Sequence, residues 1–509
     1  MKRTSPTLYK DEYGDWQTNY PLALAICQQL KQKGVNPQVI IEPTCGKGNF
    51  ILAALETFEE IEDIYGIEIN SDYLNDLSKK LKSTKQSSTR IHLINENIFD
   101  VNFNEIKASL KGKNILVLGN PPWVTNSKLG VLNSKNIPTK SNFKCYKGLE
   151  ALTGKGNFDI AENIVYRMLD LIKGELAFIA LLLKTSVIKN IVYEQGKKLT
   201  LSQIAQYNID TEKEFSASVS SALFEAKVEN SGKVKCQVFD FYTGKNIRSF
   251  GWINQHFVSN CESYLSTQFI EGKSNLTWWS GLKHDCSNVL ELSLINGVYY
   301  NKLKETVDVE DDLIYPFLKS SDLKEEKVSR CRKYIILTQH RTSEDTRLIK
   351  NVYPKAYTYL KNHSDYFDRR KSSIYLNRPK FCIFGIGDYS FKKYRIAISG
   401  LYKQTKFSLV SEINGKLALL DDTTYLLGFD KKDYALYTLK LLNSDIVQKF
   451  IEAVYFEDSK RPINKDLLMR IDLVSVLNKL GRTFLNVGEK EFEDYKMHLQ
   501  PFSEGNLFL

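Results

Sequence analysis

The sequence lacks the long apolar runs that a membrane protein needs. Nowhere do about 18 apolar residues follow one another, which is the usual minimum for a transmembrane helix. Residues 1–6 read Met-Lys-Arg-Thr-Ser-Pro, and the apolar core of a signal peptide does not follow them. Internal repeats and low-complexity tracts are absent as well. These absences predict a globular protein that stays in the cytoplasm.

Cysteine and histidine are few and scattered. No CxxC pair and no spacing typical of a zinc site occurs among the eight cysteines, at positions 27, 45, 145, 236, 261, 286, 331 and 382. We therefore expect reduced thiols and no metal site, since the six histidines form no cluster either. GxGxxG and P-loop motifs are also absent, which argues against a phosphate as the main ligand.

Length and charge set the next limits. A chain of 509 residues is long enough for two or three domains with large cores. Its 42% hydrophobic and 26% charged residues are typical of a globular protein. The net charge is +10, and 28 tyrosines and 27 phenylalanines accompany it. A basic, aromatic-rich chain is suited to binding nucleic acid, although charge alone does not identify the partner.

Four short apolar runs, each followed by turn or polar residues, predict buried strands at 39–42, 64–67, 91–94 and 115–119. Helical segments separate them. This alternation predicts an α/β fold with a doubly wound, Rossmann-like parallel sheet. In such sheets the ligand crevice lies at the carboxyl ends of the strands.

The fourth of these runs is followed by Asn120-Pro121-Pro122-Trp123. The prolines end the strand, because neither can donate a backbone N–H. The Asn120 amide and a backbone carbonyl can accept hydrogen bonds from an exocyclic amino group, while Trp123 stacks on the ring that bears it. Taken alone, the tetrapeptide is equally compatible with a simple strand end and a tryptophan in the core.

Three further strand ends carry ligand-binding features. The first strand runs into a glycine turn, Glu42-Pro43-Thr44-Cys45-Gly46-Lys47-Gly48, whose glycines allow close approach of a ligand to the backbone. Glu68 and Ile69 follow the second strand, and Glu68 lies about 20 residues after that turn, where Rossmann-like sheets place an acid on ribose hydroxyls. Asn97 and Ile98 follow the third strand and could hold the amino group and face of an adenine.

In this order the motifs resemble the γ class of amino-group DNA methyltransferases, specifically the adenine-N6 enzymes of the Taq type. Thr18-Asn19-Tyr20-Pro21 is similar to the N-terminal cofactor motif of that family, and Asn120-Pro121-Pro122-Trp123 to its catalytic tetrapeptide. The resemblance covers about the first half of the chain. The departures are Cys45 and Lys47 in the glycine turn, and Trp123 where Tyr or Phe is commoner.

The resemblance implies a set of site residues. Asn120, Pro121, Pro122 and Trp123 would be catalytic, Trp123 and Phe215 would form the target-base pocket, and no metal would be needed. S-adenosylmethionine would be the cofactor, bound by Thr18, Tyr20, Pro21, Glu42, Thr44, Cys45, Gly46, Gly48, Glu68, Ile69, Asn97, Ile98, Asn120 and Pro122. The partner would be double-stranded DNA with a short recognition sequence. The enzyme would act as a monomer, in the cytoplasm of a bacterial or archaeal cell and associated with the nucleoid. A cognate restriction endonuclease would act separately.

Three alternatives remain open. A cytosine-N4 methyltransferase uses the same chemistry, but such enzymes usually carry Ser in place of Asn120. A protein-glutamine methyltransferase shares the Asn-Pro-Pro turn but typically lacks so large a C-terminal region. A catalytically inactive DNA-binding specificity subunit is the third, and the intact Glu42, Glu68 and Asn120 argue against it.

We expect a catalytic domain at 1–242, ending near the turn Tyr242-Thr243-Gly244-Lys245, and a mixed α+β DNA target-recognition domain at 243–509. Between Arg330 and Arg395, arginines and lysines alternate with Tyr and Phe, which fits phosphate contacts and base stacking. A solvated basic face is the alternative. The polar segment 124–156 is expected either to clamp DNA or to be a disordered loop on the surface.

Three local expectations concern secondary structure. Residues 157–173 and 434–455 are each expected to form one helix, and residues 176–183 a buried strand. Gly385 and Gly387 are expected to shape a tight turn.

Overall fold

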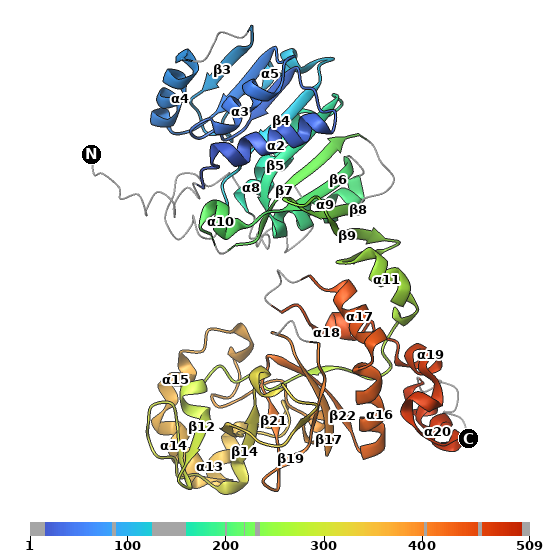
Figure 1. Ribbon diagram of the computed structural model, residues 1–509. Helices are drawn as coiled ribbons and strands as arrows, with labels where there is room; N and C mark the ends of the chain where they lie inside the picture. Colours follow the sequence, from blue (N-terminus) through green and yellow to red (C-terminus); the bar gives the residue numbers. More distant parts are fainter. Residues whose placement is uncertain are drawn as a thin grey trace. The chain divides into compact units, whose positions relative to one another are not determined.

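The structure is a computed structural model that describes residues 16–83, 88–124, 159–198, 201–217, 219–229, 235–401, 405–456 and 461–500. It divides into two compact units, Met1–Phe257 and Val258–Leu509 (Figure 1). Within the described ranges, no helix is both long and apolar enough to cross a membrane. Of the expected DNA-clamping segment 124–156, all but Val124 lies outside the described residues.

The first unit alternates helices with strands. Its helices are α2 Tyr20–Gln32, α3 Asn49–Thr57, α4 Ser71–Ser83, α5 Asn104–Leu110, α8 Ile160–Leu171, α9 Thr185–Lys198 and α10 Thr211–Phe215. Its strands are β1 Val39–Glu42, β2 Asp63–Ile67, β3 Arg90–Ile94, β4 Ile115–Gly119, β5 Ala177–Lys184, β6 Leu201–Asn208, β7 Ser221–Val228, β8 Lys235–Asp240, β9 Asn246–Ile253 and β10 His256–Val258. The four strands predicted before Asn120 therefore lie where the apolar runs placed them.

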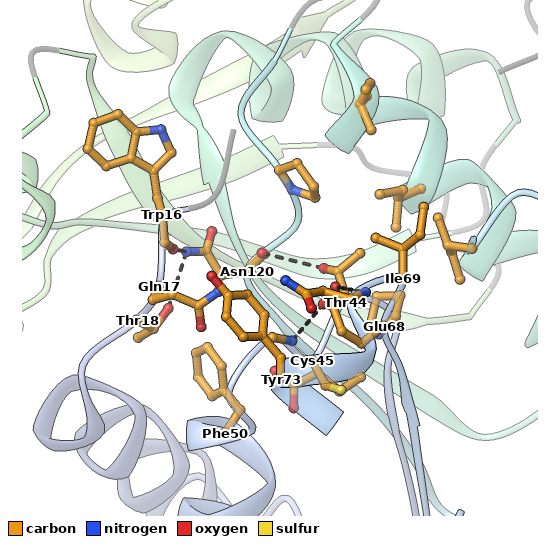
Figure 2. A pocket seen from close by; sticks show the side chains of 18 of the residues that line it. Trp16, Gln17, Thr18, Thr44, Cys45, Phe50, Glu68, Ile69, Tyr73 and Asn120 are labelled. Atoms are coloured by element: carbon orange, nitrogen blue, oxygen red, sulfur yellow. Dashed lines mark hydrogen bonds between the residues drawn. The ribbon is translucent and has the colours of Figure 1, made fainter. Parts of the chain in front are cut away.

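The strands form one sheet in the order β10-β9-β8-β6-β7-β5-β4-β1-β2-β3. Strand β1 pairs in parallel with β2 on one side and β4 on the other, and β4 pairs in parallel with β5. The doubly wound parallel sheet is thus confirmed, with β7 inserted antiparallel between β5 and β6. Strand order reverses between β1 and β4, the position at which α/β sheets open a ligand crevice. Figure 2 shows side chains gathered at this edge.

The first unit extends past residue 242, which corrects the expected boundary. The turn at 242–245 forms, but it joins β8 to β9 as an antiparallel pair instead of separating two domains. Strand β8 pairs in turn with β6, so β9 and β10 continue the first sheet. The turn residues at 242–245 therefore form a hairpin within one sheet and not a linker between two domains. The same residue types occur in hairpin turns and in linkers, so they do not distinguish the two.

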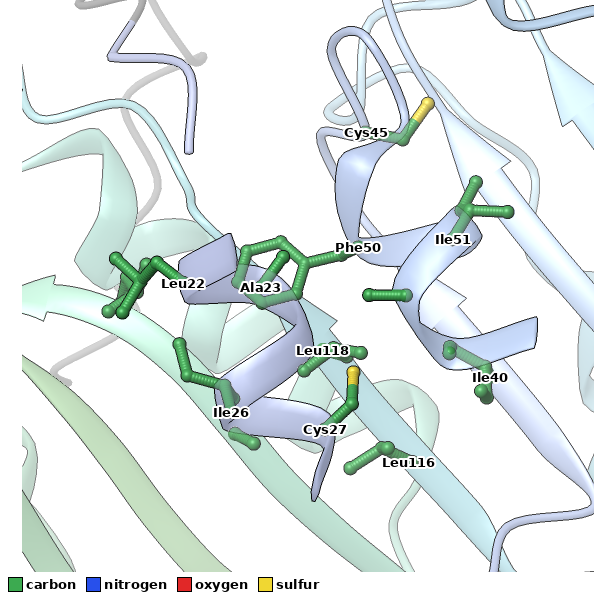
Figure 3. Packing of buried hydrophobic residues seen from close by; sticks show 14 of the residues in the cluster. Leu22, Ala23, Ile26, Cys27, Ile40, Cys45, Phe50, Ile51, Leu116 and Leu118 are labelled. Carbon is green, nitrogen blue, oxygen red and sulfur yellow. The ribbon is translucent and has the colours of Figure 1, made fainter. Parts of the chain in front are cut away.

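The core of this unit explains why its strands are apolar throughout. Every residue of β1 and β4 is buried, as expected for central strands covered on both faces. Figure 3 shows the packing of α2 and α3 on these strands, with Ala23 from α2 beside Phe50 from α3. The Asn19 side chain caps α2 by accepting from the Leu22 N–H at 2.8 Å.

The second unit contains helices and short strands in mixed order. Its helices are α11 Cys261–Thr267, α12 Ser287–Leu290, α13 Ile349–Val352, α14 Pro354–Asn362, α15 Ser364–Asp368, α16 Lys432–Leu442, α17 Asp445–Val454, α18 Lys465–Leu468, α19 Leu473–Leu485 and α20 Glu489–Leu499. Short 3-10 helices are η1 Gln268–Ile270, η2 Asp311–Leu313, η3 Ser320–Asp322, η4 Thr346–Leu348, η5 Ser373–Tyr375 and η6 Asp388–Phe391. Its strands are β11 Trp279–Ser280, β12 Glu291–Ile295, β13 Val298–Tyr300, β14 Ile314–Leu318, β15 Lys327–Val328, β16 Lys333–Ile336, β17 Tyr394–Ser399, β18 Ser408–Val410, β19 Glu412–Ile413, β20 Lys416–Leu417, β21 Leu419–Leu420 and β22 Thr424–Phe429.

Two five-stranded sheets organise this second unit. One has the order β11-β22-β17-β18-β15 and the other β13-β12-β16-β14-β21. Both mix parallel and antiparallel pairs. In the first, β18 runs antiparallel to β17 but parallel to β15, and in the second β14 runs antiparallel to β16 but parallel to β21. Helices α13 to α15 lie at one side of the unit and α19 and α20 at the other (Figure 1). The expected mixed α+β fold is confirmed.

Two local expectations need correction. Residues 434–455 form two helices, α16 and α17, because the backbone leaves the helical conformation at Asn443. The Asn443 side chain binds the backbone of Phe407, accepting from its N–H at 2.9 Å and donating to its carbonyl at 3.0 Å. Gly385 adopts φ +67° and a Cβ there would lie 2.2 Å from the Gly281 carbonyl oxygen, so glycine is required. Gly387 is extended, a backbone conformation open to any residue, although a Cβ there would lie 3.0 Å from the Tyr389 ring.

Candidate active site

A cavity of about 880 Å³, part of it open to solvent, lies at the carboxyl ends of β1 to β4 (Figure 2). The residues that line it come from the segment before α2, from the turns after the four strands, and from α8. They are Trp16, Gln17, Thr18, Glu42, Pro43, Thr44, Cys45, Gly46, Asn49, Phe50, Glu68, Ile69, Asn70, Tyr73, Glu96, Asn97, Ile98, Phe99, Asn120, Pro122, Ile160 and Ile164.

The glycine turn after β1 owes its shape to close packing. Gly46 and Gly48 both have positive φ, +49° and +76°. A Cβ on Gly46 would lie 2.6 Å from the Gln17 side chain, and one on Gly48 would lie 2.3 Å from Leu77. Gly46 lines the cavity, whereas Gly48 precedes the first residue of α3 and does not. Both glycines are therefore needed, but only one faces the cavity.

Glu68 is held at the end of β2 by backbone groups. One carboxylate oxygen accepts from the Gly46 N–H at 2.9 Å, and the other from the Asn70 N–H at 2.8 Å. A carboxylate is also a suitable acceptor for a hydroxyl of a ligand. Glu68 thus ties the glycine turn to the start of α4 and presents a fixed carboxylate to the cavity.

Glu42 is a second acid, buried at the end of β1. Burial raises the pKa of its carboxyl well above the usual value, and the nearby charge of Glu68 raises it further. Among the described residues, its Oε2 has no hydrogen-bond partner. Burial followed by the charges of Glu42 and Glu68 also raises the pKa of the Cys45 thiol, so this cysteine stays protonated and is not a nucleophile.

The electrostatic character of the cavity follows from these acids. Three carboxyl side chains line it, those of Glu42, Glu68 and Glu96, and no Lys, Arg or His is among the described lining residues. Negative charge would repel a phosphate and attract a cation. The cavity therefore suits a ligand that carries positive charge and hydroxyl groups.

Asn120 lines this cavity, and two acceptors fix its amide (Figure 2). Its Nδ2 donates to the Trp16 carbonyl at 2.6 Å and to the Thr18 hydroxyl at 3.2 Å. Its Oδ1 is buried and has no hydrogen-bond partner among the described residues. A buried acceptor without a partner is costly and points to a donor supplied by a ligand or substrate.

The rest of the Asn-Pro-Pro-Trp turn is divided between cavity and core. Pro122 lines the cavity and Pro121 does not. Trp123 is only 5% exposed, donates its Nε1 to the Leu182 carbonyl at 3.3 Å, and packs edge-to-face on Phe215 at 5.0 Å. The structure therefore brings the two predicted target-base aromatics together, but as a buried pair outside the cavity lining.

The remaining predicted residues are placed as follows. Thr18, Thr44, Ile69, Asn97 and Ile98 line the cavity. Tyr20 and Pro21 do not, because they form the first turn of α2, where the Tyr20 hydroxyl donates to Glu56.

Several cavity residues were not predicted from the sequence. Tyr73 and Asn70 lie at the start of α4, and Phe50 at the start of α3, each a few residues after a strand end. A search of the first helical turn after every strand would have found them, since those turns border the crevice. Trp16 and Gln17 carry no such signal, because only tertiary packing brings the segment before α2 to this edge.

In the second unit, some of the cations between Arg330 and Arg395 are exposed and could contact a phosphate, whereas others are buried. Arg395 is fully buried and donates to the Ser390 carbonyl at 2.8 Å and the Ala418 carbonyl at 2.6 Å. Burial lowers its pKa to about 10. This arginine supports the fold and is unavailable for the phosphate contact that the sequence suggested. Exposed cations of the same segment, such as Lys371 and Arg378, remain available.

Comparison with known proteins identifies a close relative. The type II methyltransferase M.NspV of Nostoc sp. is 40% identical over 467 residues, which are 91% of this chain and 97% of the relative. No family model matches the chain.

Solved structures of lower similarity include the type IIL restriction-modification enzyme MmeI in complex with DNA, with a TM-score of 0.47 and 12% identity over 85% of this chain. They also include the type IIG restriction endonuclease BpuSI, with a TM-score of 0.41 and 13% identity over 95% of this chain. The chain covers 62% and 60% of the lengths of these two proteins.

The cavity fits the cofactor of a methyltransferase. S-adenosylmethionine combines a cationic sulfonium and ammonium with a ribose and an adenine, and the cavity offers acids at Glu42 and Glu68 beside apolar side chains at Ile69 and Ile98. The Glu42 oxygen that lacks a hydrogen-bond partner among the described residues would be the acceptor for that positive charge. By its 40% identity to M.NspV over 91% of its length, the chain belongs to the type II methyltransferase family, and its cofactor is S-adenosylmethionine.

Proposed function

We propose that this methyltransferase modifies N6 of adenine in duplex DNA at a short specific sequence, as the modification enzyme of a type II restriction–modification system. The observation that carries the proposal is the Asn120 amide. Its nitrogen is occupied by the Trp16 carbonyl and the Thr18 hydroxyl, which turns the unpartnered Oδ1 toward an incoming donor. An exocyclic amino group is a donor of the required kind.

The chemistry follows from the electronic structure of that amino group. The N6 lone pair is delocalised into the adenine ring, so the nitrogen is a poor nucleophile. Asn120 Oδ1 and the Pro121 carbonyl would accept its two N–H groups and favour a tetrahedral nitrogen whose lone pair can attack. Bound S-adenosylmethionine would supply an electrophilic methyl group and leave as S-adenosylhomocysteine, and the methylated nitrogen would then lose one proton to solvent. Catalysis would then rest on positioning and on preorganised hydrogen bonds.

The target base must leave the duplex to reach Asn120, which costs a few kcal/mol. Trp123 and Phe215 would offset part of this cost by stacking on the extruded adenine. Because Trp123 is buried against Phe215, the base would have to separate this pair or slide over its edge. The aromatic contribution is therefore expected to involve a movement of side chains.

The second unit would recognise the DNA sequence. Exposed cations interleaved with aromatic residues between Arg330 and Lys393 support this role, since such residues contact phosphates and bases. The proposed enzyme acts as a monomer on chromosomal DNA at the nucleoid, and a cognate restriction endonuclease acts separately. Residues 1–257 would then be the catalytic domain and residues 258–509 the target-recognition domain.

The test is transfer of a tritiated methyl group from S-adenosylmethionine to plasmid DNA by the full chain, with product nucleosides separated after digestion. N6-methyladenine is expected. N4-methylcytosine would instead select the cytosine-N4 alternative. Incorporation into protein but not DNA would overturn the proposal.

A further inference from the structure

We propose that residues 369–380 of the second unit, here named the Arg370 loop, contact a groove of duplex DNA, with cations on the phosphates and Leu376 against the base pairs. This inference rests on the proposed function and adds a specific element to it. The loop reads Arg-Arg-Lys-Ser-Ser-Ile-Tyr-Leu-Asn-Arg-Pro-Lys, with five cations and no acid. Three observations support it: the rigidity of the loop, its unmatched charge, and its exposed leucine.

The loop is held together by the Arg370 guanidinium. Its Nε donates to the Phe367 carbonyl at 3.2 Å, at the start of the loop. Its terminal nitrogens donate to the Lys380 carbonyl at 2.6 Å and the Cys382 carbonyl at 2.7 Å, at the end of the loop. The same group stacks over the Tyr375 ring at 3.7 Å, in the middle of the loop. One side chain thus joins start, middle and end, so the loop is preorganised.

The apex of the loop is a sequence of tight turns. The Tyr375 and Leu376 N–H groups donate three residues back, to the Ser372 and Ser373 carbonyls. Asn377 follows with φ +58°, the left-handed conformation that asparagine tolerates best after glycine. These turns project Leu376 outward with 71% of its surface exposed, although it is a large apolar residue.

Much of the charge of the loop is unmatched. Some exposed cations elsewhere between Arg330 and Arg395 are paired with carboxylates, as in Arg332–Asp322, Arg341–Asp388, Arg347–Asp345 and Lys355–Asp308. Others form no ion pair with a described residue but are spread singly along the segment, at Arg330, Lys350, Lys361 and Lys393. In the loop, Lys380 pairs with Asp368 at 2.9 Å. Arg369, Lys371 and Arg378 are exposed and form no ion pair with any residue that the structure describes. Positive charge without a partner is therefore concentrated here.

A rigid apolar tip between unmatched cations fits duplex DNA better than a protein partner. Protein interfaces bury about 800 Å² per partner and exclude charge from their centre, which one leucine among three cations cannot satisfy. DNA offers phosphates on both sides of a groove, and groove-binding proteins insert apolar side chains between base steps. The Arg370 loop has both parts of that arrangement.

The experiment compares variants of the full chain. Lys371→Ala/Arg378→Ala removes two cations, Leu376→Ala removes the apolar tip, and Leu376→Met restores its size. Lys490→Ala and Met497→Ala are matched controls on α20, which lies at the opposite side of the unit from α15 (Figure 1). Met497 is 63% exposed, close to Leu376. Binding to a labelled duplex of mixed sequence is measured across a salt series, and methyl transfer to plasmid DNA in parallel.

The double variant should reduce the slope of log affinity against log salt by about two, roughly one for each lost phosphate contact. Leu376→Ala should leave that slope unchanged while lowering kcat/KM for plasmid methylation at least tenfold, and Leu376→Met should recover most of it. Both controls should behave as the parent chain does.

Parent-like salt slopes and methylation in all loop variants would overturn the proposal while leaving DNA methylation in place. A salt slope that depends on the loop in a chain that methylates no DNA would support the loop contact and reject the proposed function.

Discussion

Asn120, in the turn after β4, donates its Nδ2 to the backbone carbonyl of Trp16, 2.6 Å away and 104 positions earlier in the chain. The Thr18 hydroxyl is its second acceptor at 3.2 Å. These two contacts fix the orientation of the amide before any substrate binds. Preorganisation of this kind is what makes a hydrogen bond effective in catalysis, because little reorganisation remains to be done during the reaction.

Asn120→Ala should therefore lower methyl transfer by about 10²-fold or more at saturating cofactor, the usual loss when one preorganised contact is deleted. Thr18→Val removes one of the two acceptors and should lower the rate less. Tritiated methyl incorporation into DNA measures both effects, and the thermal midpoint checks the fold. Near-normal turnover by Asn120→Ala would refute the proposed role of its amide.

Trp123 needs a gentler substitution than alanine. Because it is buried, Trp123→Ala is expected to destabilise the first unit by about 3–5 kcal/mol, which would obscure any effect on base capture. Trp123→Phe keeps an aromatic ring beside Phe215 and should retain measurable activity. The comparison is kcat/KM on a normal duplex and on one with a mismatch at the target base, where less energy is needed for extrusion. A defect of equal size on both substrates would argue against base stacking.

Glu68→Ala should weaken S-adenosylmethionine binding by about 2 kcal/mol or more, as for the loss of a charge-assisted contact. The loss includes a structural part, since Glu68 also accepts from Gly46 and Asn70. Calorimetry measures it, with Glu59→Ala as an exposed acidic control. Unchanged affinity in a folded Glu68 variant would remove this residue from the site.

The pH dependence of cofactor binding should report on Glu42. Its pKa in the free protein is raised by burial and then by Glu68, and a cation bound beside it would lower that pKa. Binding of S-adenosylmethionine should therefore release a proton and strengthen as pH rises through the free-protein pKa. Calorimetry in buffers of different ionisation enthalpy measures the number of protons released when the cofactor binds. Glu42→Gln should abolish this linkage, and S-adenosylhomocysteine, whose sulfur is neutral, should show a smaller one.

The same shift has a consequence for stability. The folded state binds the Glu42 proton more tightly than the unfolded state, so stability falls as pH rises from about 4.5, the ordinary value, through the raised folded pKa. Glu42→Gln should remove this decline. Urea unfolding of both proteins across that pH range, without cofactor, provides the measurement.

Glu291 in the second unit should behave in the opposite way. Burial alone would raise its pKa, but hydrogen bonds from His284 and Lys319 outweigh burial and lower it to about 2. The stability that it contributes is present above about pH 4.5 and is lost as pH falls toward 2. Glu291→Gln should cost about 3 kcal/mol at pH 7, because Lys319 at 2.7 Å and Lys302 at 3.1 Å lose their partner. The same cost at pH 3 as at pH 7 would contradict this assignment.

Much of the candidate site could be predicted from the sequence because its signals are local. Strand ends are marked by a change from apolar to turn residues, and the parallel sheet brings successive strand ends to one edge. Glu42, Glu68, Asn97 and Asn120 were therefore expected near one another, and all four line one cavity. Their chemical types, acid or amide, are properties of the residues themselves.

Only the tertiary structure decided which distant groups meet. Trp16 reaches Asn120 because α2 packs on the sheet, and no local pattern encodes that contact. Trp123 is buried against Phe215, and Arg395 is buried among backbone carbonyls. The sequence alone does not show whether an aromatic or basic residue faces the solvent or the core. Hydrophobic periodicity and turn chemistry depend on neighbours in the chain, so the sequence determines them. Burial depends on neighbours in space, so only the tertiary structure decides it.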